Sequence, residues 1–86
     1  MSAGTLRYWA AAKAAAATEE EMYAASTLAG ALTAARARHA ADGRFARVLS
    51  SCSFLVDGAP VGTRAHEEVP LSEGGVVDVL PPFAGG

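Results

Sequence analysis

The sequence of 86 residues is poor in the residues that cross-link small proteins. It has one cysteine, Cys52, so it can form neither an internal disulfide nor a thiolate-rich metal site. Cys52 lies in SSCSFLV, where we interpret it as a small, half-buried hydrophobic residue. The two histidines, His39 and His66, have no partner at metal or triad spacing. We expect both to be satisfied locally or to face solvent, and we expect no bound metal.

Net positive charge and long apolar runs are also lacking. The formal net charge of -2 provides no net basic field to attract a nucleic acid backbone. No run approaches the ~20 apolar residues of a membrane span, and the N-terminus lacks the layout of a signal peptide. We therefore expect neither nucleic acid nor a membrane as a partner, and we expect a cytoplasmic location.

Conventional catalytic motifs are absent as well. There is no GxSxG nucleophile elbow and no GxxxxGK phosphate loop. The glutamates at 19–21 and 67–68 are interpreted as solvated charge, since adjacent side chains of an extended segment point to opposite sides. A chain of this length forms one domain with a thin core and no room for a deep substrate cavity. We expect a module that works with partners and has no catalytic site of its own.

The first part of the chain predicts two strands separated by a short helical turn. TLRYWA, residues 5–10, alternates its side chains, with Leu6 and Tyr8 on the same face, and so predicts a strand. AAKAAAA, residues 11–17, favours one or two helical turns held by packing. TEEEMYA, residues 18–24, predicts a second strand.

The principal helix is predicted over residues 26–43. Ser26 or Thr27 caps its start, and Asp42 with Gly43 supplies its end. An apolar stripe at helical spacing is predicted to face a sheet: Leu28, Ala31, Leu32, Ala35 and His39. The arginines are interpreted as solvated side chains on the helix end and on a loop after it: Arg36, Arg38, Arg44 and Arg47.

The second part of the chain predicts further strands. Residues 53–56 alternate as a strand, and Asp57-Gly58 is a strong signal for a hairpin turn, after which Pro60 favours an edge position. A turn is predicted over residues 72–75 and a last strand over 76–80. One face of that strand carries Val77 and Val79, and the other carries Val76, Asp78 and Leu80. Four or five strands with one principal helix across one face predict a two-layer α+β domain.

The tail PPFAGG, residues 81–86, is the one remaining candidate for chemistry. Its prolines stiffen the first step away from the strand, and the extended tail would reach ~20 Å. A terminal carboxylate can react as an acyl group after activation, for instance as an acyl adenylate. Glycine, which has no Cβ, lets a narrow channel close around the backbone. The alternative is a frayed end with no chemistry.

Taken together, these residues resemble the MoaD/ThiS family of small sulfur carriers, which have the ubiquitin-like β-grasp fold. The resemblance rests on four segments: LRYWAAAKAAAATEEE, STLAGALTAARARH, FLVDGAPV and PLSEGGVVDVLPPFAGG. PPxxGG directly after the last strand is the most specific of their features. The length and the opening at residues 5–17 are more similar to the MoaD branch, the small subunits of molybdopterin synthase, than to the shorter ThiS branch. The resemblance implies a β-grasp domain over residues 1–80 with a four- to five-stranded mixed sheet, followed by a flexible tail at 81–86.

The resemblance also implies a role as sulfur carrier. An E1-like adenylyltransferase of the MoeB type would adenylate Gly86 with ATP, and a cysteine desulfurase or rhodanese would supply the sulfur of a thiocarboxylate. A MoaE-like large subunit would then receive the tail and use the sulfur on cyclic pyranopterin monophosphate, in molybdenum cofactor biosynthesis. No cofactor would be bound stably by the chain itself. The residues inserted with Gly86 would be Pro81, Pro82, Phe83, Ala84 and Gly85.

Two other functions remain open at this point. The chain could deliver sulfur to thiamine thiazole, cysteine or another metabolite, or it could be a ubiquitin-like modifier or a plain interaction domain. Phe83 stands where the family usually has valine, and Lys13-Ala14 stands where many MoaD sequences have Arg-Glu. These departures leave the tail chemistry intact, and they leave open which activating enzyme and large subunit the chain fits.

Overall fold

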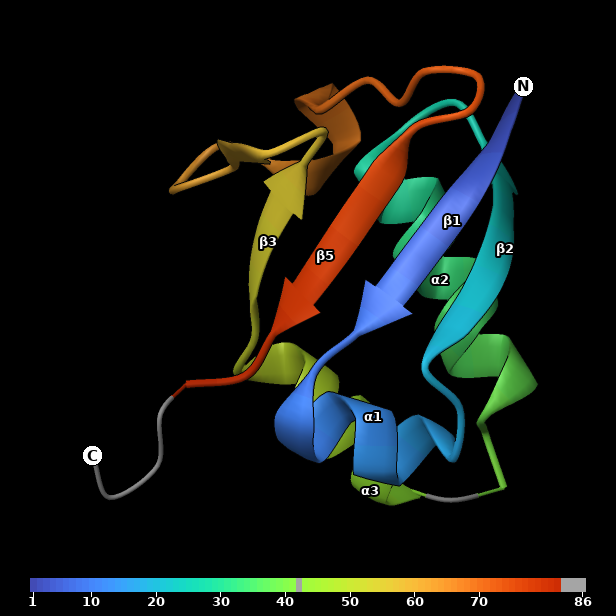
Figure 1. Ribbon diagram of the computed structural model, residues 1–86, viewed down its shortest axis with the longest axis vertical. Helices are drawn as coiled ribbons and strands as arrows, with labels where there is room; N and C mark the ends of the chain where they lie inside the picture. The colour runs from blue at the N-terminus through green and yellow to red at the C-terminus, as the bar shows by residue number, and fades with distance from the viewer. Residues whose placement is uncertain (42, 83–86) are drawn as a thin grey trace.

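A computed structural model describes residues 1–41 and 43–82 (Figure 1). The elements are β1 (Ser2–Tyr8), α1 (Ala10–Ala16), β2 (Glu20–Ala25), α2 (Leu28–Arg38), α3 (Gly43–Ser50), β3 (Ser53–Val56), β4 (Ala59–Pro60), the 3-10 helix η1 (His66–Glu68) and β5 (Val76–Leu80). The five strands form one sheet in the order β2-β1-β5-β3-β4. This is the predicted α+β, ubiquitin-like β-grasp fold with a mixed sheet.

The centre of the sheet is a parallel pair formed by the first and last strands. β1 and β5 pair from Thr5 opposite Val76 to Tyr8 opposite Val79. β2 flanks β1 and β3 flanks β5, both antiparallel. β5 has partners on both sides from Val77 to Val79, and Leu80 at its end pairs with Ser53 of β3, so the sheet holds the chain up to Leu80.

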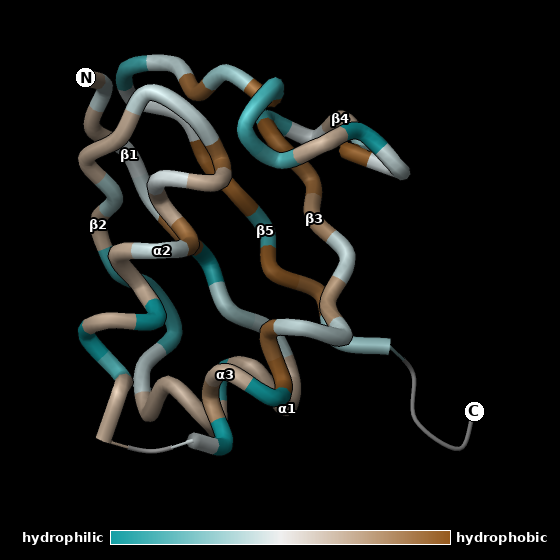
Figure 2. Tube along the Cα trace, turned by 180° about the vertical axis from the view of Figure 1, so that it is seen from behind, coloured by the Kyte–Doolittle hydropathy of each residue, from teal (hydrophilic) through white to brown (hydrophobic). Residues whose placement is uncertain are grey.

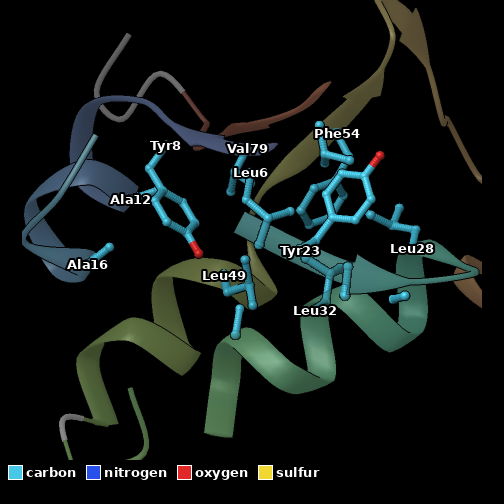
Figure 3. Packing of buried hydrophobic residues seen from close by; sticks show 14 of the residues in the cluster. Leu6, Tyr8, Ala12, Ala16, Tyr23, Leu28, Leu32, Leu49, Phe54 and Val79 are labelled. Atoms are coloured by element: carbon cyan, nitrogen blue, oxygen red, sulfur yellow. The ribbon is translucent and has the colours of Figure 1, made fainter. Parts of the chain in front are cut away.

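The helices and the inner face of the sheet enclose a single core (Figure 3). α2 lies across one face of the sheet, and α1 and α3 lie near the ends of β1 and β5 (Figure 1). Figure 2 shows hydrophobic residues along β5, in the middle of the sheet. The predicted α2 stripe is confirmed for Leu28, Ala31, Leu32 and Ala35, which are buried, whereas His39 is half-buried. Thr27 is the cap, and its hydroxyl accepts a hydrogen bond from the Gly30 N–H at 3.2 Å.

The predicted extent of the principal helix was wrong. α2 ends at Arg38, and Gly43 begins a second helix, α3, where we had expected a loop carrying Arg44 and Arg47. Phe45 and Leu49 lie one helical turn apart in α3 and are both buried, so burial of this short apolar stripe stabilises the helix. Asp42, the other predicted end residue, lies outside the described residues.

The first strand also ends earlier than predicted. β1 stops at Tyr8, and Ala10 begins α1 with a left-handed φ of 47°. The short helix at α1 and the second strand at β2 are confirmed.

Glu21 contradicts the interpretation of residues 19–21 as solvated charge. Its Oε1 accepts hydrogen bonds from the Tyr8 hydroxyl at 2.8 Å and from His39 Nε2 at 2.7 Å. Its Oε2 lies 3.4 Å from Arg38 Nε. Burial alone would raise the pKa of Glu21, but the hydrogen bonds from His39 and Tyr8 lower it overall. His39 also stacks on Phe45 at 4.3 Å between ring centroids, so it is a locally satisfied histidine, as predicted.

The hairpin signals of the second part are confirmed. Asp57 and Gly58 have φ values of 50° and 84°, as a type I′ turn requires, and Pro60 lies in the edge strand β4. The predicted turn at residues 72–75 closes with a hydrogen bond from the Gly75 N–H to the Ser72 carbonyl at 3.1 Å. Asp57 ties the two turns together, since its carboxylate accepts hydrogen bonds from the Ser72 hydroxyl and from the Val76 N–H.

Candidate functional site

The candidate site is the point where the chain leaves the sheet. β5 ends at Leu80 and continues into Pro81 and Pro82, which we call the tail root. The remaining predicted tail residues, Phe83, Ala84, Gly85 and Gly86, lie outside the described residues. What the structure places is therefore the base of the tail and the surface around it.

Two apolar hollows flank the tail root. One, of about 270 Å³, is lined by Trp9, Ala10, Leu80, Pro81 and Pro82. The other, also about 270 Å³, is lined by Ala11, Arg47, Val48, Ser51, Pro81 and Pro82. Both prolines line both hollows, so the tail root lies between them, with the start of α1 beside both hollows and α3 beside one.

Next to the tail root lies a cluster of three side chains, Arg7, Trp9 and Asp78, which we call the strand-end cluster. Asp78 Oδ1 accepts hydrogen bonds from Arg7 Nε at 2.7 Å and from Trp9 Nε1 at 2.8 Å. Asp78 Oδ2 accepts a third from Arg7 Nη2 at 3.3 Å. The Arg7 guanidinium also lies 5.5 Å from the centre of the Trp9 ring. The cluster therefore joins β1, β5 and the start of α1 on the open face of the sheet.

The hydrogen bonds from Arg7 hold the pKa of Asp78 below its ordinary value, with burial opposing them and Trp9 adding to them. Asp78 is 7% exposed, and it is the buried charged residue among the described ones. A buried carboxylate is tolerated when its oxygens are paired, and here both oxygens have partners. At neutral pH, Asp78 is thus a fixed negative charge two residues before the end of β5.

The backbone at Trp9 makes a sharp turn. Trp9 donates its backbone N–H to the Val79 carbonyl at 3.2 Å, and the next residue, Ala10, has a φ of 47°. A left-handed conformation costs a residue with a Cβ about 1–2 kcal/mol. The turn directs the chain from β1 into α1 while keeping the indole beside the end of β5.

The described residues offer little reactive chemistry of their own. In residues 1–41 and 43–82 there is no group of three or more His, Cys, Asp or Glu side chains that could hold a metal ion. Cys52 is half-buried, as predicted, and desolvation raises the pKa of its thiol to about 11, which keeps it protonated at neutral pH. None of the helices in the described part of the chain is long and apolar enough to cross a membrane. The arrangement can hold and present a chain end to another protein.

Sequence reasoning predicted the tail as the site, which stays a prediction, and it missed the strand-end cluster. Trp9 was expected within a strand, and Asp78 was expected on the strand face opposite Val77 and Val79, which is where it lies. The available signal was a charged residue amid the apolar run VVDVL, because aspartate is depleted in strands. Arg47 and Val48 were missed at the site because α3 was interpreted as a loop.

The fold defines the chain as a ubiquitin-like β-grasp domain. It belongs to the ThiS family, whose model matches residues 6–86. A comparison with curated proteins gave no match. The membership confirms the resemblance to the MoaD/ThiS family.

Solved structures support the same fold. The chain is similar to small archaeal modifier protein 1 from Methanosarcina acetivorans, with a TM-score of 0.83 and 19% identity over 100% of this chain and 98% of that one. It is also similar to a putative molybdopterin converting factor subunit 1 from Pyrococcus furiosus, with a TM-score of 0.77 and 19% identity over 96% and 100%. A complex of subunits 1 and 2 of the molybdopterin-converting factor from Helicobacter pylori matches with a TM-score of 0.68 and 21% identity over 98% and 99%. At these identities the likeness establishes the fold alone.

Proposed function

We propose that this protein carries sulfur on Gly86 for the synthesis of molybdopterin. The observation that carries the proposal is the ThiS-family match, which extends through the final Gly-Gly, on a β-grasp domain whose central strand leads directly into the tail. The domain occupies residues 1–80 and the tail residues 81–86.

The proposed chemistry takes place on the C-terminal carboxylate. A carboxylate oxygen of Gly86 attacks the α-phosphorus of ATP in an E1-like adenylyltransferase, and pyrophosphate leaves. A thiol reductant releases sulfide from the persulfide of a desulfurase or rhodanese, and this sulfide then attacks the acyl carbon and expels AMP, which leaves a thiocarboxylate. ATP is the substrate of the activating partner in this scheme.

The chain's own contribution is presentation of the tail. β5 is paired on both sides, so its end is fixed relative to the rest of the domain. Pro81 and Pro82 have a fixed φ and extend the chain away from the sheet, and glycine lets the last step fit a narrow channel. The hollows beside the tail root provide apolar surface for a partner that surrounds the base of the tail.

The second proposed partner is a MoaE-like large subunit, in which the thiocarboxylate donates its sulfur to cyclic pyranopterin monophosphate. Support for a large-subunit partner comes from the Helicobacter pylori neighbour, which is a complex of subunits 1 and 2 of a molybdopterin-converting factor. We place the complete reaction in the cytoplasm.

A modifier role is the alternative that a specific observation favours. The neighbour from Methanosarcina acetivorans is a small archaeal modifier protein with the same fold. In that role Gly86 would form an isopeptide bond with a lysine of another protein after the same activation. Sulfur delivery to thiazole or another metabolite would also use the same first two steps.

One experiment separates these functions. The protein is incubated with ATP, its E1-like enzyme and a sulfur donor, and its intact mass is measured before and after addition of the large subunit and cyclic pyranopterin monophosphate. Exchange of one oxygen for sulfur, followed by molybdopterin formation, is the expected result, and a variant lacking Gly86 should do neither while folding normally. If no sulfur is incorporated the proposal fails, and conjugates on partner lysines would replace it with the modifier role.

A further inference from the structure

The tail root lacks the contacts that usually fix a chain's direction. Neither Pro81 nor Pro82 has a backbone N–H, so neither can donate to a neighbouring strand once β5 has ended at Leu80. The residue before a proline is restricted to extended conformations, which limits both Leu80 and Pro81 but does not fix how the prolines pack. Within these backbone limits, the direction in which the tail departs depends on the side chains beside it.

Trp9 is the aromatic side chain of the hollow that it shares with the tail root. The other lining residues there are Ala10, Leu80 and the two prolines, so the indole is the largest surface against which the prolines can rest. Trp9 keeps this position although it is 47% exposed, an unusual setting for the single tryptophan of the chain. An exposed indole would ordinarily sample several rotamers.

Three separate contacts hold Trp9 in place, two at its indole and one at its backbone. Its N–H donates to Asp78 Oδ1 at 2.8 Å, its backbone N–H donates to the Val79 carbonyl at 3.2 Å, and the Arg7 guanidinium lies 5.5 Å from its centre. The left-handed backbone at Ala10 follows immediately. A strained residue persists only where the surrounding contacts over-determine it, and such strain gathers at functional positions.

Burying the Asp78 carboxylate costs desolvation free energy, so its presence in the strand calls for an explanation. It is a nearly buried carboxylate in the central strand, in a sequence otherwise of valines and leucine. Removing the charge and its partners together would leave an ordinary apolar strand. What the carboxylate adds is a fixed acceptor for the indole N–H, two residues before the end of β5.

We propose that Trp9, held in place by Asp78, is a positioning residue that sets the direction in which Pro81 and Pro82 leave the sheet. Asp78 acts through Trp9 rather than on the tail itself. The positioning effect is inferred from the structure alone, whereas its consequence for adenylation of Gly86 rests on the proposed function. By restricting the tail root before a partner binds, the cluster lowers the ordering cost of threading the tail.

The direct test is the backbone order of the tail root in solution. ¹³Cα relaxation gives order parameters for Leu80, Pro81 and Pro82 in the wild type, Trp9→Ala, Asp78→Ala and the double variant. Values near 0.85 are expected for all three residues in the wild type, with those of the prolines falling below about 0.6 in each variant while Leu80 stays rigid. The double variant should match Trp9→Ala, because Asp78 has no independent effect.

Two further readouts make the test complete. The fluorescence anisotropy of Trp9 should fall in Asp78→Ala, since the indole N–H loses its acceptor. Met22→Ala is the matched control: Met22 is 67% exposed on the edge strand β2, away from the tail root, so its removal should leave the proline order unchanged. All variants are measured at a temperature at which circular dichroism shows them folded.

The kinetic consequence is measured by pyrophosphate release from the activating enzyme. Trp9→Ala and Asp78→Ala should raise the KM for the carrier about three- to tenfold with kcat within about twofold, because the tail is less ordered before binding but reacts normally once bound. A wild-type protein that releases no pyrophosphate would refute the proposed function and leave the order parameters as the test. Prolines that stay rigid in Trp9→Ala, or that are mobile in the wild type, would overturn the positioning role.

Discussion

Arg7 and Asp78 lie opposite each other in the parallel β1–β5 pair, and their side chains form an ion pair with 2.7 Å between Nε and Oδ1. The Arg7 side chain is 44% exposed and the Asp78 side chain 10%. The guanidinium of the pair is thus in contact with solvent, whereas the carboxylate is largely buried. Water screens the arginine, so most of the stabilising effect comes from hydrogen bonds to the more buried carboxylate.

The first prediction is that Asp78 makes the stability of the domain depend on acid pH. The pKa of Asp78 is lowered from 3.8, so its contribution is fully present above about pH 4 and is lost as the pH falls through the lower folded-state value. Asp78→Asn should lower the free energy of unfolding by about 1 kcal/mol at pH 7, and the difference from the wild type should shrink below pH 4. Urea unfolding at pH 7 and near pH 3 measures both values.

The control for Asp78→Asn is Glu67→Gln, because Glu67 is an exposed carboxylate in η1. This variant should change the free energy of unfolding by less than about 0.5 kcal/mol at either pH. A loss for Asp78→Asn that is as large near pH 3 as at pH 7 would contradict the assignment to the ionised carboxylate.

The second prediction concerns Gly4, which is the strand partner of Tyr23. A Cβ on Gly4 would collide with the Tyr23 ring and with the Gly75 carbonyl. The ring is 2% exposed, and its hydroxyl donates to the Ser72 carbonyl at 2.6 Å, so it cannot move aside without breaking that bond. Gly4→Ala should therefore destabilise the domain by about 2–3 kcal/mol in urea unfolding.

Gly43→Ala is the matched control for this change. An added Cβ at Gly43 meets nothing within 4 Å, and Gly43 is the first residue of α3. Alanine favours helix over glycine, so this variant should be neutral or more stable by up to about 1 kcal/mol. Equal losses in the two variants would show that steric crowding at Gly4 is not the cause.

Local signals in the sequence were enough to predict most of the sheet. Apolar residues at every second position, Leu6 and Tyr8 in one segment and Val77 and Val79 in another, predicted the two central strands. Asp57-Gly58 predicted the hairpin. These features depend on neighbours in sequence, where the period of two and the need for positive φ leave few alternatives. The family resemblance supplied the mixed β-grasp sheet, which local patterns do not specify, and the strand order was not predicted.

The errors arose where contacts distant in sequence decide the structure. Asp42-Gly43 was interpreted as the end of one long helix, but α2 ends at Arg38 and Gly43 begins α3. The start of α3 follows from where Phe45 is buried rather than from a local signal. Glu21 was interpreted as solvated, like its exposed neighbours, because its hydrogen-bond partner His39 is 18 positions away in the sequence. The bond between Trp9 and Asp78 spans 69 positions, so no local motif could indicate it.

The third prediction tests the network around Glu21. Glu21→Gln keeps the size of the side chain but removes the charge that faces His39 and Arg38, and the amide cannot serve all the donors that the carboxylate serves. The variant should lose about 1–3 kcal/mol of unfolding free energy at pH 7. The neighbouring Glu20 is exposed, so Glu20→Gln should change it by less than about 0.5 kcal/mol.

Tyr8 gives this third prediction a spectroscopic readout. Burial raises the pKa of the Tyr8 phenol, and the hydrogen bond to Glu21 raises it further. The phenol should therefore ionise at lower pH in Glu21→Gln than in the wild type, as ultraviolet difference spectra of the folded protein would record. An unchanged phenol titration together with unchanged stability would show that Glu21 is not the centre of the network.

The last prediction addresses the tail and rests on the proposed function. Gly85→Val places a β-branched side chain next to the reacting carboxylate, where a channel that closes on glycine backbone has no room. Pyrophosphate release by the activating enzyme should fall by more than about tenfold in kcat/KM, since a side chain that cannot enter costs at least ~1.4 kcal/mol. The urea midpoint should match that of the wild type, because a residue beyond the last strand contributes little to folding.

Gly58→Ala is the control, with a change in stability and none in activation. Because Gly58 has a φ of 84°, alanine there should lower the free energy of unfolding, while activation stays unchanged at temperatures where the protein is folded. Normal activation of Gly85→Val would mean that the tail is not threaded through a narrow channel.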